Sequence, residues 1–146
     1  MTDVVDTATR SRMMAGIRAK NTAPELQIRQ SLHRLGFRFR LHDKRLPGKP
    51  DLLLPKYGAV IFVHGCFWHG HDCPTFKWPK TRAEFWRTKI GRNRENDDRH
   101  IKALHEAGWR VCVVWECSVR KSGSAILATR IAKWLDGTSH FLEISA

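Results

Sequence analysis

The sequence predicts an α/β fold in which helices flank a small mixed sheet. Apolar runs of strand length stand at 51–55, 57–65 and 109–117, and segments with helical periodicity stand before, between and after them. The chain has 146 residues, of which 42% are hydrophobic, so it can bury one core without disulfide staples. We therefore expect one globular domain.

Two helices are predicted near the N-terminus. Residues 11–21, SRMMAGIRAKN, form a short basic helix, and its apolar side consists of Met13, Met14 and Ile17. The tetrad 22–25, Thr-Ala-Pro-Glu, has the form of a capping box with proline early in the first turn. It predicts a helix over about 24–35, which Gly36 ends.

Three strands follow the second helix. Apolar and basic residues alternate in 37–42, FRFRLH, as they do in a half-buried strand. The loop LPGKP at 46–50 leads to two buried strands, DLLLP at 51–55 and YGAVIFVHG at 57–65, which a tight turn joins.

The C-terminal half continues the alternation of helix and strand. A second capping box at 81–84, Thr-Arg-Ala-Glu, opens a helical region that ends at Gly108 and is expected to break near Gly91. WRVCVVWEC at 109–117 is a third buried strand, and SAILATRIAKWL at 124–135 has the period of a closing helix.

The charge of the chain indicates a polyanionic partner. Lys and Arg number 26 against 14 Asp and Glu, and the isoelectric point is near 10.2. Nucleic acid is the leading candidate, because each neutralised phosphate releases condensed counterions, and the alternative is a basic protein that binds none. We find neither a membrane-spanning run nor a signal peptide, so we expect a soluble cytoplasmic protein whose four cysteines stay reduced.

The cysteines predict a structural zinc site. Cys66, His71 and Cys73 form a C-x4-H-x-C cluster, and Cys117 lies just past the third buried strand, where a loop can bring it alongside. Four such ligands close a tetrahedral site, which makes it structural rather than catalytic. Cys112 lies among alternating apolar residues and is better explained as a small core residue.

The catalytic candidates lie beside the buried strands. Asp51 follows Pro50 at the start of its strand, where a carboxylate can hold Mg²⁺ or simply cap a turn. The capping box explains Glu25 without catalysis, although its carboxylate could also hold water bound to the metal. His64 and His69 are left over by the zinc assignment, and either is a candidate general base.

The aromatic residues near the cysteines suggest contact with bases. Phe67 and Trp68 lie between a zinc ligand and a candidate base, where the fixed backbone leaves little room for them in the core. A protruding aromatic pair on a basic protein can stack on bases or enter between them. Trp86 could belong to the same surface, or it could form a core and rim pair with Phe85.

Long motifs in this sequence resemble the very short patch repair endonucleases of bacteria over about residues 6–120. These motifs are ATRSRMMAGIRAKNT, LPGKPD, VIFVHGCFWHGHDC, TRAEFWRTKIGRN and GWRVCVVWEC. The resemblance implies a restriction-endonuclease-like fold, a variant of the PD-(D/E)xK nucleases. It also implies an enzyme that nicks DNA 5′ to the thymine of a T·G mismatch, which arises when 5-methylcytosine deaminates.

The resemblance assigns the catalytic and metal-binding residues. Asp51 would ligate Mg²⁺ together with the backbone carbonyl of Val63, and His69 would be the general base. His64 and Glu25 would support the hydration shell of the metal and the scissile phosphate. Zinc would be bound by the four residues that the spacing already suggests, which are Cys66, His71, Cys73 and Cys117.

The resemblance also implies how DNA is held. Phe67, Trp68 and Trp86 would form a wedge that enters from the major groove, with Met14 approaching from the opposite side. Lys89 and Asn93 would contact the edges of the mismatch. Residues 1–20 would form a basic DNA-contacting arm and residues 21–146 a single endonuclease domain.

The expected partner is double-stranded DNA that contains a T·G mismatch. We expect a cytoplasmic monomer that works beside the bacterial nucleoid and a cytosine methyltransferase, with other mismatch-repair proteins as further candidate partners. Two alternatives stay open. A zinc-containing DNA-binding module would leave Asp51 and His69 without a purpose, and a related single-strand or restriction nuclease has less need of the Phe67 and Trp68 pair.

Overall fold

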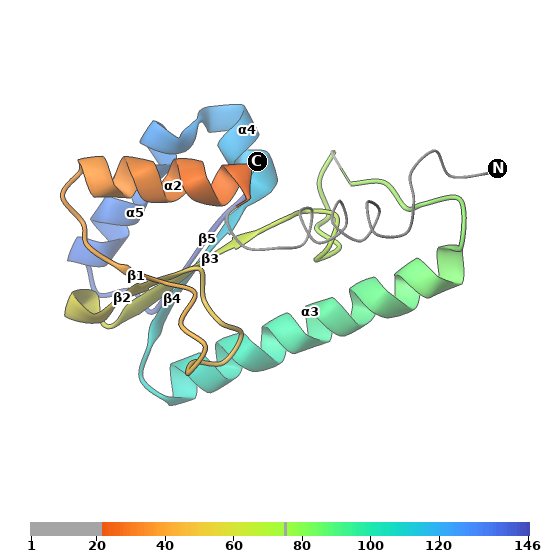
Figure 1. The fold of residues 1–146 in the computed structure, drawn as a ribbon, viewed down its shortest axis with the longest axis horizontal. Coiled ribbons are helices and arrows are strands. Elements are labelled where there is room, and N and C mark those ends of the chain that lie inside the picture. Colours follow the sequence, from red (N-terminus) through yellow and green to blue (C-terminus); the bar gives the residue numbers. More distant parts are fainter. Residues whose placement is uncertain (1–21, 75) are drawn as a thin grey trace, which may run out of the picture.

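The computed structural model describes residues 22–74 and 76–146. Within them a five-stranded mixed sheet has helices on both faces (Figure 1), which confirms the predicted fold class. The predicted basic helix at 11–21, which carries Met14, lies outside the described residues.

The N-terminal half of the described chain supplies one helix and three strands. Their bounds are α2 (Ala23–Arg34), β1 (Arg40–Leu41), β2 (Leu52–Leu54) and β3 (Ala59–His64). The predicted tight turn between β2 and β3 is a short 3-10 helix closed by Gly58 at φ 60°, a left-handed conformation that favours glycine.

The C-terminal half supplies three helices and two strands. Their bounds are α3 (Ala83–Glu106), β4 (Arg110–Trp115), α4 (Glu116–Ser122), α5 (Ser124–Asp136) and β5 (Phe141–Ile144). The prediction of a break near Gly91 is wrong, since α3 runs through it without interruption. Neither α4 nor β5 is predicted by the sequence patterns.

The strands follow the order β1-β2-β3-β4-β5 across the sheet. The pairs β1–β2 and β2–β3 are antiparallel, whereas β3–β4 and β4–β5 are parallel. His64 at the end of β3 therefore pairs with Trp115 at the end of β4. The 65–73 loop and the start of α4 consequently leave the sheet at the same edge, and the candidate zinc ligands lie there.

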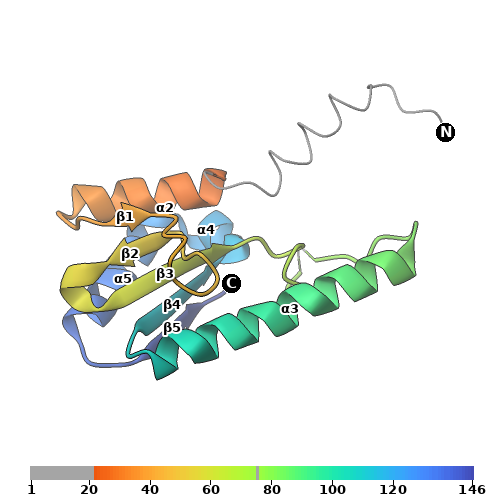
Figure 2. The same ribbon diagram turned by 60° about the horizontal axis from the view of Figure 1, so that its bottom comes forward.

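Two apolar layers cover the sheet, one on each face. Residues of α2 and α5 pack on one face, and their buried side chains include Ile28, Leu32, Leu127 and Ile131. The other face carries Val60, Phe62, Val111 and Val113, which pack with Leu104 of α3. Figures 1 and 2 show α2, α4 and α5 on one side of the sheet and the long α3 on the other.

Both capping boxes mark the helix starts, but neither acts as a cap. Thr22 and Arg82 are the N-cap residues of α2 and α3, and neither side chain makes a capping hydrogen bond. Glu25 is instead buried, with 2% of its surface exposed, and it hydrogen-bonds to His42 across the fold. The capping box therefore does not account for the position of Glu25, which is bonded across the fold.

The FRFRLH strand is shorter than its pattern indicates. Only Arg40 and Leu41 pair with β2, because β2 itself has three residues and His42 leaves the strand at φ 49°. Within the described part of the chain, no helix combines the length and the apolar character that crossing a membrane requires.

Candidate active site and metal centre

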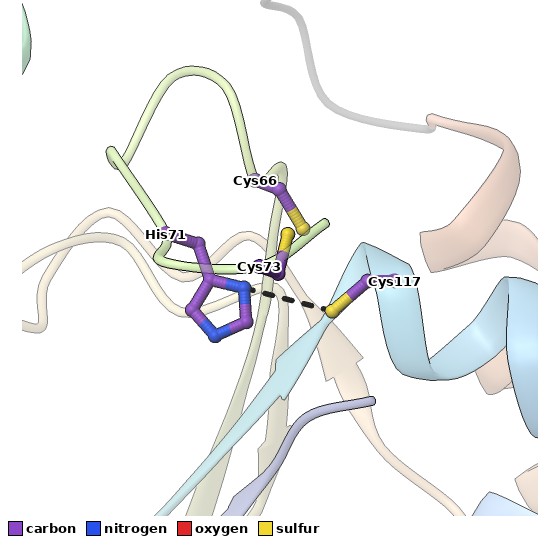
Figure 3. Close-up of side chains that lie close together, drawn as sticks. All are labelled: Cys66, His71, Cys73 and Cys117. Carbon is purple, nitrogen blue, oxygen red and sulfur yellow. Dashed lines mark hydrogen bonds between the residues drawn. The ribbon is translucent and has the colours of Figure 1, made fainter. Parts of the chain in front are cut away.

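The four predicted zinc ligands come together at the edge of the sheet. Cys66, His71, Cys73 and Cys117 place one potential ligand atom each within 4.8 Å of one another. Their side chains face one another in Figure 3, where a dashed line joins Cys117 Sγ and His71 Nδ1 at 3.5 Å. Three thiols and an imidazole are ligands that zinc prefers, so the cluster is consistent with a structural zinc site.

Cys117 reaches this cluster from a helix rather than from the loop that the sequence suggests. It lies in the first turn of α4, which starts directly after β4. The Cys66 N–H donates to Glu116 Oε1 at 3.3 Å, and the His71 N–H donates to the Cys66 carbonyl at 2.9 Å. The first bond holds the 65–73 loop against α4 and the second closes the loop on itself, so the fold brings the ligands together.

The raised pKa of the Cys66 thiol also fits a bound cation. Burial raises the pKa of the Cys66 thiol to about 12, and the thiols of Cys117 and Cys73 add to the rise. The Cys66 thiolate therefore needs a nearby positive charge, which a metal ion supplies. Cys112 is fully buried in the core and does not belong to the cluster, as its apolar neighbours indicate.

A second cluster, Glu25, His42 and Asp51, lies where α2 meets the start of β2. Glu25 Oε2 hydrogen-bonds to His42 Nε2 at 2.7 Å and accepts a hydrogen bond from Arg29 Nη1 at 3.2 Å. Asp51 Oδ2 accepts the Val63 N–H at 2.6 Å. Two carboxylates and an imidazole thus meet beside Val63, whose backbone carbonyl the resemblance assigns to the metal.

The ionised form of Asp51 is disfavoured in this cluster. Burial raises the pKa of Asp51 to about 8, and the charge of Glu25 contributes in the same direction, against the hydrogen bond from Val63. A divalent cation would remove this penalty by neutralising both carboxylates. The donor set therefore fits a hard metal ion held at Asp51.

A third cluster, His64, His69 and Asp97, adjoins the second. His69 Nδ1 makes a short hydrogen bond to Asp97 Oδ2, and the His64 ring stacks on the His69 ring with centroids 3.9 Å apart. Burial lowers the pKa of His64 well below its ordinary value, and the charges of His69 and His71 lower it further. His64 is therefore neutral at physiological pH, and His69 is the histidine with a carboxylate partner.

The three predicted wedge residues that the structure describes form one aromatic cluster. Phe67 lies 5.2 Å from both Trp68 and Trp86, and the two tryptophans are 5.6 Å apart, measured between ring centroids. All three side chains are partly buried, whereas Phe85 is 43% exposed. Asn93 Nδ2 donates to the Trp68 carbonyl at 2.8 Å and thereby fixes the backbone of the cluster.

One cavity of about 1190 Å³ connects the second and third clusters with the aromatic residues. A single face of α3 forms one of its walls, with Trp86, Lys89, Asn93, Asp97 and His100 at steps of three or four residues. Lys44 and Lys49 also line the cavity and place positive charge alongside its acidic groups. The cavity therefore joins acidic groups for a metal, a histidine base, aromatic rings and positive charge.

The structure brings the described predicted site residues to this cavity or to the adjacent zinc cluster, and it adds two that the sequence analysis missed. His42 ends a strand pattern, and nothing around it distinguishes it from a surface histidine. Asp97 is one of two aspartates in a charged helix, 28 residues from its partner His69. Its spacing of four residues from Asn93 is the one signal that could have placed it on the cavity face.

Comparison with known proteins identifies the family. The family model described as DNA mismatch endonuclease Vsr matches residues 2–75. The DNA mismatch endonuclease Vsr of Escherichia coli is 48% identical over 99% of this chain and 94% of its own length. Type II nicking enzymes are similarly close: that of Xanthomonas oryzae pv. oryzae is 47% identical over 93% of this chain and 98% of its own, and that of Neisseria meningitidis serogroup A is 46% identical over 82% and 86%. The chain therefore belongs to the Vsr family of DNA mismatch endonucleases, and its substrate is DNA.

Proposed function

We propose that this enzyme is a Mg²⁺-dependent endonuclease that recognises T·G mismatches and nicks the strand 5′ to the mismatched thymine. Such mismatches arise when 5-methylcytosine deaminates, so the nick would initiate very short patch repair. The observation that carries the proposal is the shared cavity, which is lined by Asp51, His69 and the aromatic cluster together. The groups proposed for hydrolysis and those proposed to test base stacking would thus face the same bound DNA.

Mg²⁺ would be held by Asp51 and the backbone carbonyl of Val63, with Glu25 beside them. When bound, Mg²⁺ would polarise the scissile phosphate and lower the pKa of the attacking water. Asp51 is kept in place by the Val63 N–H, and Glu25 is kept in place by Arg29 and His42. This fixed arrangement supports a metal site that requires little reorganisation on binding.

His69 would accept the proton of the attacking water. Its Nδ1 is hydrogen-bonded to Asp97, so Nε2 is the ring nitrogen left to accept the proton. The Asp97 carboxylate stabilises the imidazolium that forms and fixes the orientation of the ring. His64 supports this ring by stacking on it and, being neutral, does not repel the imidazolium.

Phe67, Trp68 and Trp86 would enter the base stack at the mismatch from the major groove. Opening a base step costs a few kcal/mol, and a wobble pair should be easier to open than a Watson–Crick pair. Lys89 and Asn93 line the cavity on the same helix face and would contact the mismatch edges. Met14 and the rest of the basic arm at 1–20 would approach from the opposite side, ahead of the single endonuclease domain proposed for 21–146.

Zinc would be held by the four clustered residues that Figure 3 shows. It would tie the 65–73 loop, which carries Phe67, Trp68 and His69, to α4. The zinc site would thus be structural and would support both the wedge and the base. We further propose that the enzyme acts as a cytoplasmic monomer near the bacterial nucleoid, with other mismatch-repair proteins as candidate partners.

The test compares duplexes that differ in one base pair. Duplexes with T·G, T·A or C·G at the same position, each strand labelled in turn, are incubated with the enzyme and Mg²⁺, and the products are mapped. We expect a nick on the thymine strand of the T·G duplex, 5′ to the thymine, none in EDTA, and nicking at least about a hundredfold slower with Asp51→Asn. Equal nicking of the matched duplexes would instead favour a nicking enzyme that requires no mismatch; two of the relatives are named type II nicking enzymes.

A further inference from the structure

His42 contacts both carboxylate residues of the candidate metal site, Glu25 and Asp51. Its backbone N–H donates to the Asp51 carbonyl at 3.2 Å, and its ring Nε2 lies 2.7 Å from Glu25 Oε2. Its side chain is 13% exposed and lines the cavity. The residue adopts a left-handed backbone conformation, φ 49°, which non-glycine residues rarely adopt. An imidazole nitrogen is therefore presented to the same space as the two carboxylates.

The spacing of the three side chains suits one shared cation. A ligand atom from each of Glu25, His42 and Asp51 lies within 4.8 Å of the others. In an octahedral site with ligands at 2.0–2.1 Å, neighbouring ligand atoms are about 3 Å apart. The 2.7 Å between His42 Nε2 and Glu25 Oε2 is close to that edge, so a metal can replace the shared proton with small movements.

Holding Glu25 in place does not by itself require His42. Arg29, one helical turn along α2, already donates to the same Glu25 oxygen at 3.2 Å. The imidazole is moreover the one group among the three clustered side chains that supplies nitrogen in place of oxygen. Its distinctive contribution to the site is thus a nitrogen ligand.

A nitrogen ligand changes which metals a site prefers. Mg²⁺ favours oxygen ligands and keeps much of its water, whereas divalent transition metals bind imidazole more readily. We propose that His42 is a direct protein ligand of the catalytic metal and shifts the preference of this site from Mg²⁺ towards first-row transition metals such as Mn²⁺. This inference rests on the proposed function, because it takes Asp51 as the anchor of that metal.

The test measures metal binding directly, with Mn²⁺ as the probe and with zinc-loaded protein. Wild type, His42→Gln and the control His105→Gln are titrated with Mn²⁺, followed by the electron paramagnetic resonance of free Mn²⁺, and with Mg²⁺ by competition. His105 is a suitable control because it lies at the far end of α3 and bonds to the His140 carbonyl, away from the cavity. Zinc content and circular dichroism establish that each variant is folded.

We expect His42→Gln to weaken Mn²⁺ binding about tenfold or more and Mg²⁺ binding by much less, because glutamine offers oxygen where the imidazole offered nitrogen. His105→Gln should change neither affinity. Pulsed electron paramagnetic resonance of bound Mn²⁺ should show nitrogen coupling in wild type and in His105→Gln, and no such coupling in His42→Gln. Asp51→Asn should weaken the binding of both Mn²⁺ and Mg²⁺, which would show that the measured Mn²⁺ occupies the site at Asp51.

Two results would overturn the inference. If wild type lacks nitrogen coupling to bound Mn²⁺, His42 is not a ligand. If His42→Gln weakens Mn²⁺ and Mg²⁺ equally, the residue acts only by positioning Glu25. Either result leaves the proposed function intact as long as the T·G duplex is nicked. Loss of nicking specificity in a wild type that binds Mn²⁺ through nitrogen would refute the proposed function alone.

Discussion

Trp68 is the side chain whose removal tests the proposed wedge most directly. Its ring is partly buried and touches Phe67 and Trp86, so part of its surface remains available to a base. A stack of one base on one aromatic ring contributes about 1–3 kcal/mol to binding. Trp68→Ala should therefore weaken binding to a T·G duplex by about 5- to 150-fold. Trp68→Phe keeps a ring and should lose less.

The same substitution has a cost in stability that the assay must separate from binding. Trp68→Ala removes the ring contacts with Phe67 and Trp86, each contributing about 0.5–1.5 kcal/mol beyond the burial of apolar area, so the free energy of unfolding should fall by at least about 1–3 kcal/mol. The backbone carbonyl that Asn93 holds is unchanged, and Trp68 is not among the clustered zinc ligands, so zinc should stay bound. Urea denaturation and zinc analysis measure these two quantities.

The binding assay consists of titrations of T·G and matched duplexes at two salt concentrations, without added divalent metal. Binding to matched DNA depends mainly on phosphate contacts, so its affinity and salt dependence should change little in Trp68→Ala. Equal losses on both duplexes would refute the reasoning, as would no loss on either. The aromatic cluster would then be a packing feature beside the zinc site.

Four further predictions concern the zinc site, the Cys112 thiol, the catalytic residues and the long helix. Cys117→Ala should lose zinc and much of the folded structure, whereas Cys112→Ala should keep zinc, as elemental analysis can establish; a purified wild type without zinc would contradict this. Because burial raises the pKa of Cys112, its thiol should stay protonated and resist alkylation in the native protein as the pH rises from 7 to 9, and rapid labelling would show that the core opens. Asp51→Asn and His69→Ala should bind the T·G duplex nearly as wild type does, yet nick it at least about a hundredfold more slowly; a wild-type rate in either variant would mean that its role is misassigned. A Cβ at Gly91 would meet no heavy atom within 4 Å, so Gly91→Ala should raise the free energy of unfolding by about 0.5–1 kcal/mol in urea denaturation. A lower free energy of unfolding in Gly91→Ala would contradict this prediction.

The central strands and long helices could be predicted because their sequence patterns are unambiguous. β3 and β4 are continuous apolar runs, as expected for strands that are buried on both faces. α4 was missed because it starts directly after β4, with no turn residue between them. β5 was missed because FLEI is short and follows a polar turn, and its pairing with β4 is a long-range contact that no local pattern reveals.

The candidate site was predicted in part for a similar reason. Ligands and aromatics that crowd into ten positions stand out in the sequence, so the 64–73 segment was recognised. His42 and Asp97 are isolated in sequence and acquire a role only through their partners Glu25 and His69. For Glu25 the capping box offered a local explanation beside the catalytic one, although the residue is bonded across the fold.

The row of cavity residues along α3 restricts how the length of this enzyme can vary. Trp86, Lys89, Asn93 and Asp97 face the cavity together because the helix keeps them in phase over an uninterrupted run. One inserted or deleted residue between Asn93 and Asp97 would turn the two ends of the row apart by about 100° and shift them by about 1.5 Å. The aromatic end would then leave the cavity while the carboxylate that holds the histidine stayed. A point substitution along this helix changes one side chain and keeps the others in phase. An insertion or deletion between Asn93 and Asp97 instead separates the residues proposed for recognition from those proposed for hydrolysis in a single step.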